Sequence, residues 1–213
     1  MEGTDVVRSQ HWIKSRLAGD FLLFSVTAVE LTILVVETRT FTLVDWIYIS
    51  QHLIVLGVAL TRTAPEATDY SFFSSVAVVV SYTYSYAQVG ILGWEPGEAT
   101  WPAGGLVLVT IAAFLSLASL LSLGRSFGVR PALRRLVTRG PYRFVRHPMY
   151  LAYILSDVGY NLQEWNVGTL LVVLVGWTSL SYRIHAEEGV LSHDAGWPAY
   201  ISSVPYRVIP GLW

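Results

Sequence analysis

The sequence contains no cysteine and few charged residues, and its Lys and Arg residues total only 14 of 213. Without cysteine the chain can form no disulfide bond, no thiolate nucleophile and no metal site with thiolate ligands. Charged residues make up 14% of the chain, whereas a soluble domain carries about a quarter. The formal net charge of −1 provides no overall field that would attract nucleic acid. These shortages exclude most soluble, disulfide-rich and nucleic-acid-binding classes.

Apolar residues are abundant instead, at 53% of the chain with a mean hydropathy of +0.49. They gather in blocks of the length that crosses a bilayer, which is about 20 residues for a helix. The first twenty residues lack the apolar core of a signal peptide. We therefore predict an all-α fold, a polytopic integral membrane helical bundle. Its four spans are expected at residues 21–36, 43–60, 72–92 and 104–123, and a C-terminal helical hairpin is expected from 149–161 and 167–182.

Basic residues predict the orientation of these spans. One lysine and thirteen arginines occur, and seven of the arginines lie between residues 125 and 146. Cytoplasmic loops carry an excess of Lys and Arg, so four spans plus a hairpin place both termini in the cytoplasm. We divide the chain into a cytoplasmic segment (1–20), a four-helix transmembrane scaffold (21–123) and a cofactor-binding catalytic region with a cytoplasmic tail (124–213). The excess of arginine over lysine is typical of a GC-rich prokaryotic genome, which favours a prokaryotic inner membrane.

Three tyrosines fall inside the third predicted span, at Tyr82, Tyr84 and Tyr86. Hydroxyl groups within a membrane need hydrogen-bond partners. These tyrosines are expected to bond neighbouring helices, and the alternative is that they line a ligand pocket.

The first dense polar cluster runs from Gly140 to Tyr150. Residues before a proline disfavour the helical conformation, so residues 139–147 are expected to be irregular. Pro148 suits the first position of a helix, which places Arg146 and His147 beside free backbone N–H groups. Such a helix N-terminus binds carboxylates and phosphates. The alternative for basic residues here is lipid headgroup binding, which we expect of Arg130, Arg134 and Arg135.

The second cluster, Glu187 and Glu188, lies at the C-terminal end of the sixth apolar stretch. Two acids there oppose the helix dipole, although Arg183 lies one turn earlier and can pair with Glu187. Taken alone, the pair is either a solvated helix end or a site for a cation. The predicted topology brings both clusters to the same cytoplasmic side. Together they would hold a ligand with an amino-acid head, and S-adenosyl-L-methionine carries such a head beside a reactive sulfonium.

The residues of these clusters resemble a known family. The pattern Leu136-Val-Thr-x-Gly140-x-Tyr142-x-x-x-Arg146-His-Pro-x-Tyr150 is similar to that of the isoprenylcysteine carboxyl methyltransferases and related membrane phospholipid methyltransferases. The likeness continues after it, and covers some ninety residues from Gly124 onward. Its further matching residues are Arg183, Glu187, Glu188, Leu191, Gly196, Tyr200 and the closing Arg207-Val-Ile-Pro210.

The resemblance implies a membrane methyltransferase that binds S-adenosyl-L-methionine from the cytosol and uses no metal. Its acceptor would be a lipophilic or membrane-soluble molecule that enters from the bilayer and offers a carboxylate, amine or thiol. We expect Arg183 and Glu188 to act in catalysis. The residues expected to bind the cofactor are Arg146, His147, Pro148, Tyr150, Glu187 and Glu188.

The chain departs from the family pattern in several places. Ala152 and Ala195 replace a usual glycine and phenylalanine. Eukaryotic carboxyl methyltransferases of the family use an arginine in the helix before the motif, whereas residues 104–123 carry no charge here. The prenylcysteine carboxylate is therefore not assured as the acceptor, and its functional group stays open.

Other functions fit the sequence less well. Di-iron membrane enzymes need many histidines, and this chain has five, so a metal site at His185, Glu188 and His193 is a weak alternative. Sterol reductases share an Arg-His-Pro…Glu-Glu pattern but have more spans. The remaining alternative is a non-enzymatic lipid-binding or accessory membrane protein that retains the family fold.

Overall fold

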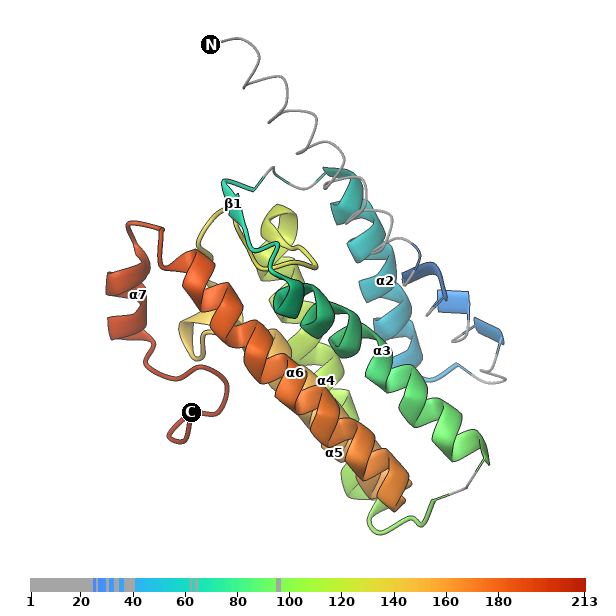
Figure 1. Ribbon diagram of the computed structural model, residues 1–213. Helices are drawn as coiled ribbons and strands as arrows, with labels where there is room; N and C mark the ends of the chain where they lie inside the picture. The colour runs from blue at the N-terminus through green and yellow to red at the C-terminus, as the bar shows by residue number, and fades with distance from the viewer. Residues whose placement is uncertain are drawn as a thin grey trace.

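The protein is described by a computed structural model that covers residues 25, 27–29, 31–32, 35–36, 41–61, 63, 65–94 and 97–213 (Figure 1). The predicted N-terminal segment and half of the first predicted span lie outside the described residues. The long helices are α2 (Leu43–Thr61), α3 (Phe72–Trp94), α4 (Pro102–Leu123), α5 (Pro148–Gln163) and α6 (Val167–Leu191). The short elements are β1 (Ala67–Thr68), η1 (Gly124–Ser126), β2 (Ala132–Leu133), η2 (Gly140–Arg143) and α7 (Trp197–Ser203).

Three stretches of the described chain are long and apolar enough to cross a membrane: α2, α4 extended through Ser126, and α6. The helical bundle of an integral membrane protein, predicted from the composition, is consistent with these helices. The full count of four spans and a hairpin stays a prediction. Helix α5 begins at Pro148 as expected, whereas α6 continues nine residues beyond the predicted end at 182. The last turns of α6 carry charged side chains, and their charged partners belong to the site described below.

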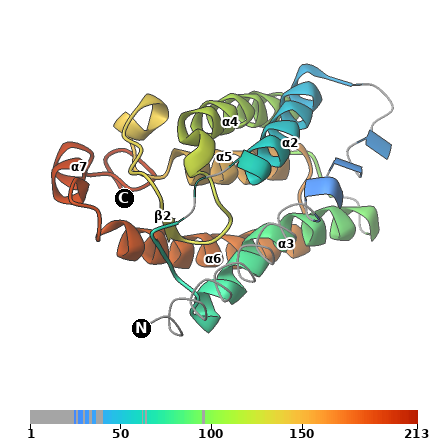
Figure 2. The same ribbon diagram turned by 90° about the horizontal axis from the view of Figure 1, so that it is seen from above.

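The long helices form two layers (Figure 2). Helices α2, α4 and α5 lie on one side, with α4 packed along α5, and α3 and α6 pack along each other on the other side. Small residues permit the close contacts within each layer. The carbonyl oxygen of Gly105 in α4 lies against Gly159 in α5, and Gly176 in α6 lies under the ring of Tyr84 in α3. In a membrane, small residues at such crossings let the backbones approach closely.

The connections between helices pair at the two ends of the bundle. At one end Glu98, before α4, exchanges backbone hydrogen bonds with Trp165 in the α5–α6 turn, at 2.8 and 3.1 Å. At the other end β1 pairs antiparallel with β2, which ties the α2–α3 loop to the linker between α4 and α5. An apolar cluster fills the space between the layers beside this linker. Its buried members are Val58, Ala59, Val78, Leu120, Phe127 and Val129.

Replacing Gly159 with alanine tests the packing of α4 on α5. The added Cβ would lie 2.8 Å from the Gly105 carbonyl oxygen and from a methyl carbon of Val109. Because one obstacle is backbone, the two helices must separate, and we expect a loss of about 1–3 kcal/mol in the free energy of unfolding. Thermal melting of the purified protein in detergent measures this loss.

Gly57→Ala in α2 is the matched control, since nothing lies within 4 Å of a Cβ at that helical position. Alanine favours the helix by about 0.5–1 kcal/mol over glycine, so this variant should melt at or slightly above the wild-type temperature. Equal melting temperatures for Gly159→Ala and the wild type would contradict the proposed close contact.

Candidate functional site

The site begins at the N-terminus of α5. Gly140 has a φ of +62°, a conformation that residues with a side chain rarely adopt, and it starts the η2 turn. The chain then reaches His147, the N-cap of α5, with Pro148 at the first helical position. Of the segment predicted to be irregular, residues 140–143 form the short η2 helix, and the irregular conformation is confirmed for 144–147. His147 is only 5% exposed, so its imidazole is held inside the protein rather than in solvent.

The C-terminal tail pairs with this N-terminus. The backbone N–H groups of Arg146 and His147 donate to the carbonyls of Tyr206 and Arg207, at 3.0 and 2.7 Å. The guanidinium of Arg146 also donates to the carbonyls of Val204 and Pro205. The tail is thereby fixed beside the helix N-terminus that the sequence predicted as an anion site.

Glu188 is the centre of the charged cluster. One of its oxygens accepts from Nε of Arg146 at 2.7 Å, and the other accepts from Nε of Arg207 at 2.9 Å. Nε2 of His147 lies 3.3 Å from the first oxygen. Because the side chain of Glu188 is only 12% exposed, these contacts compensate a carboxylate that would be costly to bury alone. Glu188 thus joins α6, the start of α5 and the tail.

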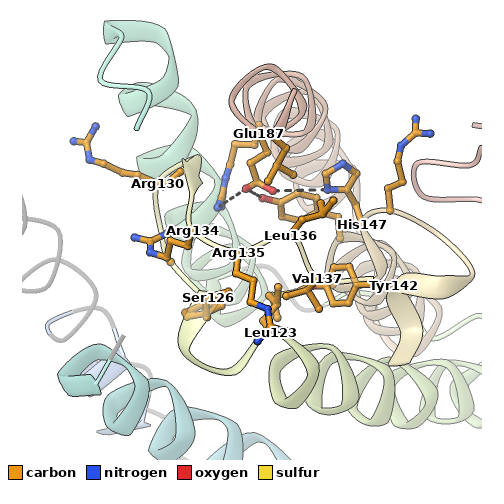
Figure 3. Close-up of a pocket in the computed structure, with 18 of the residues that line it drawn as sticks. Leu123, Ser126, Arg130, Arg134, Arg135, Leu136, Val137, Tyr142, His147 and Glu187 are labelled. Carbon is orange, nitrogen blue, oxygen red and sulfur yellow. Dashed lines mark hydrogen bonds and ion pairs between the residues drawn. The ribbon is translucent and has the colours of Figure 1, made fainter. Parts of the chain in front are cut away.

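Glu187 has different surroundings and faces a pocket (Figure 3). Its carboxylate accepts a hydrogen bond from the hydroxyl of Tyr150. It lies 3.7 Å from Nδ1 of His147 and 3.6 Å from Nη2 of Arg183. The rings of His147 and Tyr150 are stacked, with centroids 5.6 Å apart. His147 therefore lies between the two glutamates and holds the aromatic wall of the pocket in place.

Arg183 is a buried cation on the pocket wall, 3% exposed. It donates to the hydroxyl of Ser81 at 2.8 Å and to the carbonyl of Val129 at 2.9 Å. Its guanidinium carbon lies 5.4 Å from the ring centroids of both Tyr82 and Tyr150. Within the described part of the chain its Nε–H has no hydrogen-bond partner. A buried donor without a partner loses stability, and a ligand oxygen would satisfy it.

The pocket lies between the layers, beside the linker. Of the residues predicted from the sequence, Arg146, His147, Tyr150, Arg183 and Glu187 line it, and Pro148 and Glu188 do not. Its further lining residues include Tyr82, Tyr142, Tyr153, Leu136, Val137, Trp197 and Tyr200.

Three arginines of the linker also line this pocket: Arg130, Arg134 and Arg135. The sequence suggested lipid headgroups as their partners, because nothing in it shows that the linker folds back between the layers. Arg134 donates to the carbonyl of Thr63 at 3.1 Å, which fixes its position. Arg135 is exposed, and no hydrogen bond or ion pair joins it to the residues that the structure describes. Figure 3 shows it extending toward Leu123, away from Glu187.

Two tyrosines of the predicted motif close the pocket. The hydroxyl of Tyr200 in α7 donates to the backbone carbonyl of Tyr142 in η2, at 2.7 Å. Burial, and after it the nearby Glu187 carboxylate, raises the pKa of Tyr142 well above its ordinary value. Burial also raises the pKa of Tyr200. Both phenols therefore stay neutral at physiological pH and act as hydrogen-bonding groups rather than as bases.

The tyrosines of α3 have divided roles. Tyr84 bonds a neighbouring helix, because its hydroxyl donates to Asp157 in α5. Tyr82 lines the pocket. Both alternatives considered for this stretch therefore occur, on different tyrosines. Among the described residues no group of three His, Asp or Glu side chains is placed to hold a metal ion.

Comparisons with known proteins find relatives over the region that contains this pocket. The family model described as "Isoprenylcysteine carboxyl methyltransferase (ICMT) family" matches residues 105–193. Protein-S-isoprenylcysteine O-methyltransferase B of Arabidopsis thaliana is 24% identical over 183 residues, which cover 80% of this chain and 91% of that protein. Protein-S-isoprenylcysteine O-methyltransferase of Schizosaccharomyces pombe is 32% identical over 99 residues, 44% of this chain and 42% of that protein.

A third relative, protein-S-isoprenylcysteine O-methyltransferase A of Arabidopsis thaliana, is 30% identical over 98 residues, 43% of this chain and 50% of that protein. The matches to the second and third relatives thus span half of their length or less. These relatives are eukaryotic, and the prokaryotic inner membrane stays a prediction. The matched region contains α5, α6 and the linker, which supply most of the pocket wall. Residues 105–193 of this chain are therefore similar to the isoprenylcysteine carboxyl methyltransferase family, whose relatives named here are methyltransferases, as the motifs indicated.

Proposed function

We propose that the protein is an integral-membrane methyltransferase that takes its methyl group from S-adenosyl-L-methionine and transfers it to a lipophilic acceptor. One observation carries the proposal. Within the family region, a pocket presents the carboxylate of Glu187 beside the buried, partly unpartnered guanidinium of Arg183. Opposite charges at this spacing match the ammonium and carboxylate of an amino-acid head. The alternative of a non-enzymatic accessory protein is not favoured, since the relatives are methyltransferases.

The residues present fit this cofactor. Glu187 would hold the ammonium, and the free Nε–H of Arg183 would donate to the carboxylate, a charge-assisted hydrogen bond. Tyr150 and His147 would form the wall beside it. Glu188 does not line the pocket, so its proposed contribution is to position His147 and Arg146. The bound cofactor would supply an activated methyl group on its sulfonium.

Charge balance favours an anionic acceptor over an amine or a thiol. Among the residues that the structure describes, five arginines and one glutamate line the pocket, and the proposed cofactor itself carries net positive charge. An acceptor with an acidic head would compensate this excess of positive charge. The linker arginines would bind that head, since α4 has no charged residue to do so. A carboxylate acceptor has no proton to lose, so the protein would act mainly through proximity and alignment. The named relatives are O-methyltransferases of isoprenylcysteine proteins, and a carboxylate of that kind fits this proposal.

Arginine placement supports a cytosolic pocket. The segment on the pocket side of the bundle, between α4 and α5, carries seven arginines between residues 125 and 146. The described residues at the opposite end, 97–101 and 164–166, contain two glutamates and no basic residue. By the positive-inside rule the pocket end would face the cytosol, where the cofactor is available.

Glu187→Gln tests the cofactor assignment. S-adenosylhomocysteine keeps the amino-acid head, so titration calorimetry with this compound reports binding of that head to purified protein. Removing one partner of a charged hydrogen bond costs about 1.5–3 kcal/mol, and we expect affinity to fall at least tenfold. Glu66→Gln is the control, because Glu66 is exposed and outside the pocket. Wild-type affinity in Glu187→Gln would reject the assignment, and no heat with wild-type protein would reject the proposed function.

Arg135→Ala tests the anionic acceptor. We expect it to raise the KM for a prenylated cysteine with a free carboxylate several-fold, because a charged partner of the acceptor is lost, while the affinity for S-adenosylhomocysteine is unchanged. The assay follows transfer of a labelled methyl group in membranes, and base-labile product would identify an ester. Arg139→Ala is the matched control, an exposed arginine nearby that does not line the pocket.

Two results would contradict the anionic acceptor. One is equal KM values for the Arg135 and Arg139 variants. The other is faster methylation of a lipophilic amine with the same hydrocarbon chain than of the carboxylate.

A further inference from the structure

A buried acid outside the pocket joins the two layers of the bundle. Asp157 lies in the middle of α5 and is 5% exposed. One of its oxygens, Oδ2, accepts a hydrogen bond from the hydroxyl of Tyr84 in α3 at 2.9 Å and another from Nε1 of Trp177 in α6 at 2.8 Å. The residue does not line the pocket. A carboxylate buried among membrane helices is costly, so it usually has a function.

Asp157 lies at the seam between layers, which we define as the contact of α5 with α3 and α6. Although α5 and α6 are consecutive, their backbones approach each other much less than those of α4 and α5 or of α3 and α6. Figure 2 shows the two layers on either side of this seam. The acid therefore connects two units that are each more tightly packed internally.

The other contacts of the seam divide into two kinds. At the pocket end Tyr150 bonds Glu187, and at the turn end the hydroxyl of Thr169 donates to the side chain of Asn161. Between these ends, apolar side chains of α5 such as Ile154 pack against a cluster that includes Leu180 and Ile184 of α6. Apolar contacts between membrane helices can be exchanged for contacts with lipid chains at little cost. The two bonds to Asp157 are therefore the contacts that distinguish a closed seam from one occupied by a hydrocarbon chain.

The seam also leads to the pocket. Tyr153, one helical turn before Asp157 on α5, lines the pocket, as does Tyr150 one turn further. A hydrocarbon chain inserted beside Asp157 would thus end at the pocket wall. Hydrogen bonds between membrane helices are individually weak, so two of them can break and reform on the timescale of substrate binding.

We propose that Asp157 is a latch: its bonds from Tyr84 and Trp177 hold the seam closed, and their release admits a lipophilic acceptor from the bilayer to the pocket. The inference rests on the proposed function, because it assumes an acceptor that enters from the membrane. Asp157 does not touch the cofactor pocket, so its contribution is to acceptor access rather than to cofactor binding.

The absence of cysteine from the sequence permits a direct test of access. A single thiol is introduced into the pocket as Met149→Cys, and the protein is reconstituted in phosphatidylcholine vesicles. Its alkylation rate is measured with a long-chain maleimide dissolved in the bilayer and with a charged, water-soluble maleimide. In this background Asp157→Leu removes the acceptor of both bonds without adding polarity. We expect labelling by the lipid-soluble reagent to become about tenfold faster, as the loss of two weak interhelical bonds predicts, and labelling by the water-soluble reagent to stay unchanged.

Further variants separate a latch from general loosening. Asp157→Asn keeps an oxygen acceptor and should label close to the parent rate. Tyr84→Phe removes one of the two bonds to Asp157 and should give an intermediate labelling rate. If Asp157→Leu does not fold, the labelling rate of Tyr84→Phe tests the latch in its place. Gln51→Leu is the matched control, because Gln51 is also a buried polar residue of the bundle but bonds Ser116 and Ala113 within the α2–α4 contact. It should not change the rate.

Equal rates for the parent, Asp157→Leu and Tyr84→Phe would overturn the latch. So would a parallel increase with both reagents, or the same increase in Gln51→Leu. The labelling does not require methyl transfer. A protein that fails to bind S-adenosylhomocysteine would therefore refute the proposed function without deciding this test.

Discussion

The ion cluster around Glu188 is the interaction on which the site depends. This carboxylate receives Arg146, His147 and Arg207, which come from the start of α5 and from the tail. Breaking a buried ion pair by removing one partner costs about 3–5 kcal/mol, because the remaining charge is left uncompensated. The tail, the helix N-terminus and the end of α6 are therefore positioned together. Once they are, His147 and Tyr150 lie beside Glu187 on the pocket wall.

Glu187 and Glu188 are neighbours on α6, but their side chains point in different directions and have different partners. Glu188 points to the tail side and has both oxygens paired with arginines. Glu187 points to the pocket, where a phenol donates to it and an imidazole and the guanidinium of Arg183 lie further away, at 3.7 and 3.6 Å. A carboxylate saturated by cations has little capacity left for a ligand ammonium, whereas one with weaker partners retains it. The difference arises from the direction of the side chains and not from residue type.

The two-layer arrangement explains where a ligand can be accommodated. Close packing through Gly105, Gly159 and Gly176 makes each layer compact, so space remains between the layers rather than within them. The linker with its arginines folds over one end of this space, and β1–β2 pairing secures it there. Polar contacts at Asp157 cross the same boundary further along the bundle. A lipophilic acceptor and a polar cofactor would thus approach from different directions and meet at the arginine-lined pocket.

Much of this protein could be predicted from the sequence. Hydrophobic blocks of spanning length predicted helices where α2, α3 and α4 occur, and Pro148 marked the start of α5, because helix length and proline stereochemistry are local properties. The motif around Arg146 and the pair Glu187–Glu188 also indicated the family, since those residue types occur in a characteristic order. The sequence could not show that Arg135 and its neighbours return to the pocket, nor that the tail uses the N–H groups of Arg146 and His147. It also did not reveal Asp157 as a contact between layers. These features depend on residues that are separated in the chain, by 73 positions for Tyr84 and Asp157, and only the packing of the helices decides which of them meet.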